Sequence, residues 1–246
     1  MARAWSVNLE HGDQWWYAHV AELPGCFTRG STREAVLASL GKAIADHLAF
    51  LGAHGHRLEG GSSGFAVVEE VEGIPELGES GGAVALFASD KASVGAQEFD
   101  GSLNLMQWNR GELLALIQPI PEDTRNARAL PGKRTLNETL RHVMNAEEWY
   151  ISRLGLGVQK EYEGHARRLR LGRRQTIPER LVVTRKAAVQ TLKEVFERGK
   201  LGIFTRVAHT RHPEEEWTFR KVLRRFVEHE REHIGTIREL LLALPH

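Results

Sequence analysis

The stretch FVEHEREHIGTIRELLLAL (226–244) decides the fold of the second half of this chain. Its apolar residues recur with helical spacing, and it places His229 and His233 four residues apart. Side chains at this spacing project from one face of a helix, where two imidazoles can bind a single metal ion. A metal site needs at least a third protein ligand. His142 is the best candidate, because its neighbours Val143 and Ala146 place it near the buried face of another predicted helix.

Three further helices are predicted upstream of this stretch. Thr135 begins a capping box, in which a hydroxyl residue is followed three positions later by Glu138, and Pro178 stands at the first turn of another helix. The four predicted helices cover 104–117, 135–155, 178–199 and 218–244. Helices of this length predict a four-helix bundle, and the wide gaps between them imply at least one long connection.

The letters HEREH (229–233) also match the H-E-x-x-H pattern of zinc metalloproteases, in which Glu230 would be the general base. Three features disfavour this interpretation. The two middle positions are both charged. Thr236 and Glu239 stand where an extended motif would have glycine and histidine. The helix also continues to the end of the chain, without a turn that would return a later ligand to the site.

The first half of the chain has a different charge and a different pattern. Residues 1–95 carry 6 Lys and Arg against 12 Asp and Glu, and the remainder carries 27 against 20. Partial alternation predicts a β-hairpin, a short third strand, a capped helix and further strands. These elements cover 4–10, 15–23, 26–28, 32–52, 65–71 and 83–88. The glycine-rich and serine-rich stretches 73–82 and 89–101 are the natural boundary, which we place near residue 98.

Cys26 is the only cysteine, so the chain forms no internal disulfide and no cysteine-ligated metal cluster. We expect it to be a small packed residue. The first residues lack the pattern of a secretory signal, and no apolar stretch approaches the roughly 20 residues that cross a membrane. A cytoplasmic protein without membrane insertion is therefore expected.

The segments RHVMNAEEWYISRL (141–154) and EEWTFRKVLRRFVEHEREHIGTIREL (215–240) resemble the DinB-like family of metal-binding four-helix bundles. The resemblance covers about 100–244. It implies that His142, His229 and His233 bind one divalent metal ion, and that Trp217 lies at the entrance to the last helix. Members of the family include thiol-dependent transferases, a thiol-dependent isomerase and many proteins without known activity. The resemblance therefore implies the metal site more firmly than the reaction.

The segment WWYAHVAELPGCFTRGSTREAVLASLGKAIADHLAFL (15–51) resembles the HicB-like antitoxin domain, over about 4–72. The matching positions are Leu23-Pro24-Gly25-Cys26, Gly30, Thr32 and Glu34-Ala35. In that family the unit binds a toxin partner and often carries a DNA-binding appendage, for which no segment is evident here. A protein-binding or dimerising module is implied, and we expect a homodimer. The predicted fold is thus a two-domain α+β protein, with a HicB-like domain over 1–98 and a DinB-like bundle over 99–246.

Three neutral imidazoles leave a bound ion its full charge, which lowers the pKa of a bound water or thiol. This suits zinc, nickel, iron or copper, with zinc, nickel or iron expected. The sequence therefore predicts a metal-dependent thiol S-transferase, using a small-molecule thiol, or a hydrolase. Asn145 and Glu230 are the polar groups expected near the site. The alternative is a non-enzymatic metal-binding or ligand-binding protein that acts through a partner protein, in an antitoxin-like or stress-related role.

Two other groups of residues invite a functional interpretation. The arginine-rich stretch RRLRLGRR (167–174) is typical of a phosphate-binding segment, but the chain is nearly neutral and no aromatic residues accompany it. We expect a solvated connection between helices and no binding of nucleic acid, although an anionic substrate or thiol cofactor would suit these arginines. His47, His54 and His56 are expected at the surface.

Overall fold

The computed structural model describes residues 4–56, 64–172, 174–199 and 202–244. By proximity the chain groups into two compact units. The first unit consists of residues 1–93 and 205–224, and the second consists of residues 94–204 and 225–246. The sequence suggested one boundary near residue 98, whereas the spatial grouping also assigns 205–224 to the first unit.

The first unit contains a four-stranded mixed sheet in the order β3-β2-β1-β4. The predicted hairpin is formed by the antiparallel pair β1 and β2, in which Leu9 lies opposite Ala18. β3 pairs antiparallel with β2, and β4 pairs parallel with β1, with a bulge between Val7 and Asn8. The strands are β1 (Trp5–His11), β2 (Trp16–Val20), β3 (Phe27–Gly30) and β4 (Phe65–Val71).

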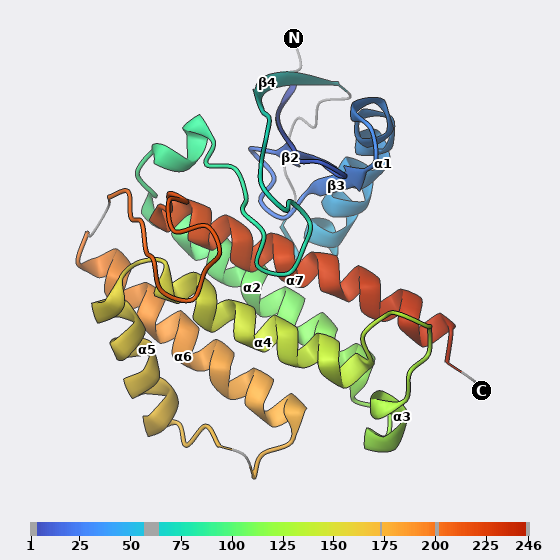
Figure 1. Cartoon of the computed structure of the whole chain (residues 1–246), viewed down its shortest axis with the longest axis vertical. Helices are drawn as coiled ribbons and strands as arrows, with labels where there is room; N and C mark the ends of the chain where they lie inside the picture. Colours follow the sequence, from blue (N-terminus) through green and yellow to red (C-terminus); the bar gives the residue numbers. More distant parts are fainter. Residues whose placement is uncertain (1–3, 57–63, 173, 200–201, 245–246) are drawn as a thin grey trace. The chain divides into compact units, whose positions relative to one another are not determined.

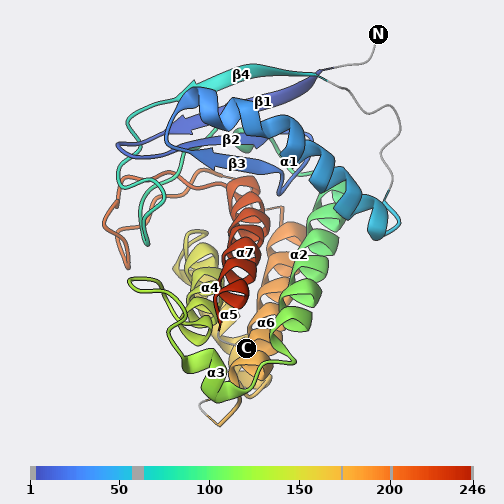
Figure 2. The same cartoon turned by 90° about the vertical axis from the view of Figure 1, so that its right-hand side faces the viewer.

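Helix α1 (Arg33–Ala53) packs against β2 and β3 (Figure 2). Its N-cap is Thr32, whose side chain accepts a hydrogen bond from the backbone N–H of Ala35. Its buried residues recur every three or four positions: Val36, Leu40, Ile44, His47 and Leu51. The expectation of a surface position for His47 was wrong, since its side chain belongs to this buried face.

By length and composition alone, α1 passes the criterion for a membrane-spanning helix. The expectation that no stretch of the chain reaches this criterion was therefore wrong. The criterion is weak evidence for a membrane span, because the core helix of a soluble protein also passes it. In this unit, α1 buries apolar side chains such as Val36 and Leu40.

The stretch 73–82, predicted as part of a linker, is a tightly turned loop of the first unit. Ile74 donates a backbone hydrogen bond to His11 at 3.0 Å, and Leu77 is buried. The loop closes on itself where Ala83 donates to Pro75 at 3.0 Å. The strand predicted over 83–88 is not formed: this segment pairs with no strand of the sheet and leads into the short helix η1 (Ala88–Lys91).

The second unit is a bundle built on four long helices, which lie side by side in Figure 1. They confirm the four predicted helices, and α2 begins eight residues before its predicted start. The predicted long connection between the second and third of them contains an additional helix, α5. The helices are α2 (Ala96–Ile117), α3 (Glu122–Asn126), α4 (Leu136–Ser152), α5 (Leu156–Arg168), α6 (Ile177–Glu197) and α7 (Phe219–Leu242), of which α7 contributes its residues from Arg225 onward to this unit.

An apolar core joins the four long helices at the end of the bundle that contains the start of α4. Its members are buried side chains at helical spacing on each helix, so the faces predicted from periodicity are those that pack. The cluster consists of Leu113 and Ile117 on α2, Leu136, Leu140, Val143 and Met144 on α4, Ile177 and Leu181 on α6, and Ile234, Ile237 and Leu240 on α7.

The loop that ends at Gly82 provides a stability test of the first unit. A Cβ atom on Gly82 would lie 1.9 Å from the carbonyl oxygen of Glu76, so Gly82→Ala requires the backbone to move. We expect the free energy of unfolding, measured by urea titration, to fall by about 1–3 kcal/mol. Gly41→Ala is the matched control, because nothing lies within 4 Å of its added Cβ in α1. This change should stabilise the protein by roughly 0.5–1 kcal/mol, and equal losses for both variants would contradict the tight turn.

Candidate metal centre

Three histidines from two helices meet in the second unit. His142 comes from α4, and His229 and His233 come from α7. The Nε2 atom of His229 lies 3.0 Å from that of His142 and 3.1 Å from that of His233. One ring nitrogen from each residue lies within 4.8 Å of the other two. The structure therefore brings together all three histidines singled out in the sequence.

The spacing of these nitrogens suits a single metal ion. Imidazole nitrogens about 2.0–2.1 Å from a tetrahedral ion lie about 3.3–3.4 Å apart, and the two short separations are within a few tenths of an ångström of this value. The rings of His142 and His233 are nearly perpendicular, at 83°. Three nitrogen ligands from the protein leave a fourth position for another ligand, which is the arrangement of catalytic rather than structural zinc sites.

Burial keeps His142 and His229 in the neutral form that binds metals. It lowers the pKa of His142 to about 4, and the charge of Arg134 acts in the same direction. The pKa of His229 is also held well below its usual value, chiefly by burial and then by the two neighbouring histidines. Both side chains therefore present unprotonated nitrogens at neutral pH, and protons do not compete strongly with a metal ion.

Glu230, the candidate general base, does not serve this centre. Its side chain is 2% exposed, and its two carboxylate oxygens accept hydrogen bonds from Arg110 at 2.6 Å and Arg185 at 2.8 Å. Burial alone would raise the pKa of Glu230, but the two guanidinium groups outweigh it and hold this pKa below its usual value. The neighbour of His229 in the sequence is therefore fixed as an ion-paired carboxylate, which excludes the role it has in zinc metalloproteases.

Glu230 belongs to a closed ring of four buried charges, one from each long helix. We call Arg110 on α2, Glu147 on α4, Arg185 on α6 and Glu230 on α7 the charge quartet. Each arginine pairs with both glutamates, and Arg185 lies 2.6 Å from Glu147. The arginines also donate to backbone carbonyls, Arg110 to Leu181 and Arg185 to Met106. The quartet is thus electrically neutral and richly hydrogen-bonded.

The sequence contained a weak signal for the quartet. Arg110, Glu147 and Arg185 occur on the apolar faces of predicted helices, where an unpaired charge is costly. Helical periodicity marks such positions as buried, but it does not identify the partner. Pairing across four helices is a tertiary property, and residues 110 and 230 are 120 positions apart in the chain.

The remaining candidate residues lie in various environments. Asn145 is exposed on α4, whereas Trp217, two residues before α7, is 1% exposed. Cys26 is buried, as predicted. In the stretch 167–174 the described arginines are exposed, and they occupy the end of α5 and the connection to α6. His54 and His56 are exposed.

The depressed pKa of His142 generates a test on the metal-free protein. The unfolded chain gains a proton near pH 6.5, whereas folded His142 gains it only near pH 4. The unfolded state therefore binds more protons in this window, and stability falls as the pH falls from about 6.5 toward 4. NMR titration should give a midpoint near 4 for the imidazole signal that disappears in His142→Gln. A midpoint near 6.5 would contradict the buried, neutral site.

The charge quartet generates a second test. Arg185→Met leaves Glu147 and Glu230 with only one guanidinium partner, so we expect a loss of about 3–5 kcal/mol in the free energy of unfolding. Arg198→Met is the matched control just after the end of α6, because Arg198 forms an exposed ion pair with Glu161. Its loss should stay below about 1 kcal/mol. Similar losses of unfolding free energy in the two variants would show that the buried quartet stabilises the protein no more than an exposed ion pair does.

Similarity to known proteins is found for a solved structure and for a protein family. A solved structure of YfiT from Bacillus subtilis, described as a probable metal-dependent hydrolase with an unusual four-helix bundle topology, is similar with a TM-score of 0.45 and 16% sequence identity. The similarity covers 65% of this chain and 92% of that chain. No curated protein matches at a significant level. The model of the DinB superfamily matches residues 105–237, which is more than half of the chain and includes all three histidines. The chain therefore belongs to the DinB superfamily.

Proposed function

We propose that the bundle binds one divalent metal ion through His142, His229 and His233, and that the protein is a metal-dependent enzyme of nucleophilic chemistry, a hydrolase or a thiol S-transferase. The observation that carries this proposal is the meeting of three ring nitrogens within 4.8 Å of one another, two of them on side chains kept neutral by burial. When bound, a divalent ion held by neutral imidazoles lowers the pKa of a water or thiol and polarises a carbonyl.

The surroundings of the triad favour an anionic substrate or a thiolate. Arg134 and Arg225 both lower the pKa of His229, but the charge of Arg225 is paired with Glu228 at 3.2 Å. Arg134 is exposed, and its charge attracts an anion to the site. The ring of Tyr150 stands edge-on to His229 at a centroid distance of 5.7 Å, so an aromatic side chain forms one wall of the centre. Its burial excludes water from that side.

The commitment of Glu230 to the charge quartet constrains the mechanism. The buried carboxylate of Glu230 accepts hydrogen bonds from two arginines, which lower its pKa. These hydrogen bonds hold the carboxylate away from the triad, so it is not placed to remove a proton there. In this proposal the three imidazoles are metal ligands, so their coordinating nitrogens do not act as a general base. The attacking water or thiol would therefore lose its proton because its own pKa is lowered. That proton would pass to solvent or to the leaving group.

For the first unit we propose a role as a protein-binding module, on its resemblance to HicB-like domains. The mixed sheet with one packed helix is consistent with this role. β4 is an edge strand with Phe65 and Val68 exposed, and an exposed strand edge offers backbone groups to a partner.

The metal proposal is tested by the metal content of the purified protein. We expect about one zinc, nickel or iron ion for each chain by mass spectrometry of the metals, and almost none after His142→Ala, His229→Ala or His233→Ala. His54→Ala is the matched control, because His54 is exposed outside the triad. Equal metal content in the wild type and the triad variants would overturn the ligand assignment.

The reaction is tested with the metal-loaded protein and two sets of substrates. Hydrolysis of p-nitrophenyl esters would support a hydrolase, and consumption of glutathione or cysteine with 1-chloro-2,4-dinitrobenzene would support a thiol transferase. Either activity should fall at least tenfold in His229→Ala and remain in His54→Ala. Stoichiometric metal without either activity would favour the alternative, a metal-binding protein that acts through a partner.

A further inference from the structure

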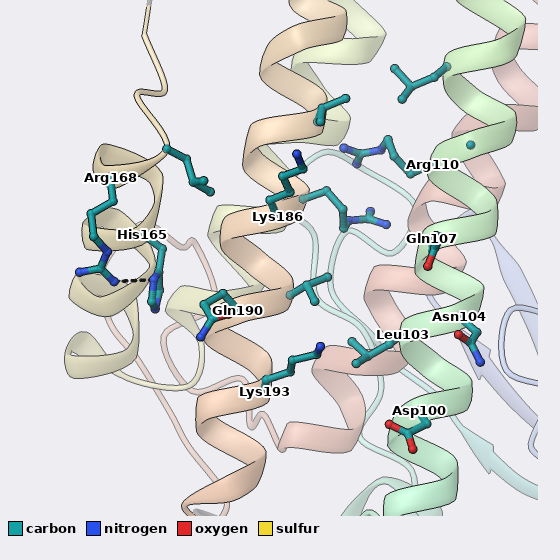
Figure 3. Close-up of a pocket in the computed structure, with 16 residues that line it drawn as sticks. Asp100, Leu103, Asn104, Gln107, Arg110, His165, Arg168, Lys186, Gln190 and Lys193 are labelled. Atoms are coloured by element: carbon teal, nitrogen blue, oxygen red, sulfur yellow. Dashed lines mark hydrogen bonds between the residues drawn. The ribbon is translucent and has the colours of Figure 1, made fainter.

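A groove in the second unit lies between α2 and α6 and reaches the end of α5 (Figure 3). Its volume is about 1100 Å³, which exceeds that of many small-molecule sites. The lining residues on α2 run from Asp100 to Leu114, and those on α6 run from Val182 to Lys193. They recur every three or four positions, so one face of each helix borders the groove, over about 20 Å on α2. The described lining residues include none of the three histidines of the metal centre.

The groove carries an excess of positive charge. Arg168, Lys186 and Lys193 line it, against the single carboxylate of Asp100. Within the described parts of the chain, no carboxylate forms an ion pair with Lys186 or Lys193. Arg110 also contributes to the lining, but it is neutralised within the charge quartet. An anion in the groove would therefore meet uncompensated ammonium groups, which attract it from solution.

Apolar side chains alternate with these charges along the same two helices. Val189 is three residues after Lys186, so it lies on the next turn of the same face of α6. Leu103 projects from α2 into the space between the helices in Figure 3, toward the side from which Lys193 extends. Leu103 and Val189 are half-buried, and an apolar group laid on them would remove further apolar surface from water.

We propose that this groove binds a small amphipathic organic anion, with its acid group beside Lys186 and its apolar tail along Leu103 and Val189. Asp100 lies at the opposite end of the lining face of α2. Its carboxylate would repel the acid group of the ligand, so the acid group is expected beside Lys186 and not beside Asp100. Arg110 and Arg185, which are 5% and 6% exposed, also form part of the lining. A lining with charged and apolar parts suits a small ligand that has one polar end. An amphipathic helix would instead need a continuous apolar groove for its apolar face.

The probes are decanoate, decanol and acetate, measured by isothermal titration calorimetry on the full chain. We expect decanoate to bind, decanol to bind more weakly and acetate not to bind detectably. Lys186→Gln with Lys193→Gln should weaken decanoate about tenfold and leave decanol within about twofold. Lys160→Gln is the matched control, because Lys160 is an exposed lysine of α5 outside the groove. Val189→Gln should weaken decanoate and decanol alike.

Several results would overturn the proposal. Absence of decanoate binding would do so, as would binding that is unchanged in both the lysine double variant and Val189→Gln. A dimer that dissociates in Val189→Gln, in a protein that binds no decanoate, would instead identify the groove as an interface between copies of this chain. Thermal unfolding of each variant confirms that it is folded. Decanoate should bind His142→Ala as tightly as the wild type, so this test is independent of the metal proposal.

Discussion

The pairing of two arginines with two glutamates at the centre of the bundle is the constraint on which the second unit depends. Each long helix contributes one charge, and each charge pairs with two opposite charges on other helices. A shift of any helix by one turn, about 5.4 Å, would separate its charge from both partners. An unpaired buried charge costs several kcal/mol, so alternative alignments of the helices are strongly disfavoured. Apolar packing alone is less selective, because aliphatic side chains tolerate substitution and small shifts.

The same alignment determines the geometry of the metal centre. His229 directly precedes Glu230 on α7, and His142 is five residues before Glu147 on α4. When the glutamates are paired, the relative positions of α4 and α7 are set, and the three ring nitrogens meet. The quartet therefore helps to position the three histidines, although none of its side chains belongs to the triad.

Side chains at adjacent positions on a helix point about 100° apart. The motif HEREH (229–233) can therefore direct its histidines to the triad and Glu230 to the charge quartet. His229 and His233 share a face and point to the triad, while Glu230 points to Arg110 and Arg185. The letters of a zinc metalloprotease motif are present, yet the glutamate is turned into the core of the bundle. On the side of the bundle bordered by α2 and α6, the two arginines of the quartet reach the lining of the cationic groove. The two arginines of the quartet therefore belong both to the core and to the groove lining.

The sequence by itself determined most of the long elements of both units and singled out the three histidines that meet in the bundle. The strand expected over 83–88 and helix α5 are exceptions. Apolar periodicity and capping residues such as Thr32 and Thr135 are local properties, so they predicted α1, α4 and the hairpin from nearby residues alone. Tertiary structure decided the role of Glu230, the burial of His47 and the packing of the 73–82 loop. Each of these depends on partners far away in the chain or on close approach of the backbone, and a linear pattern of residue types does not encode those distances.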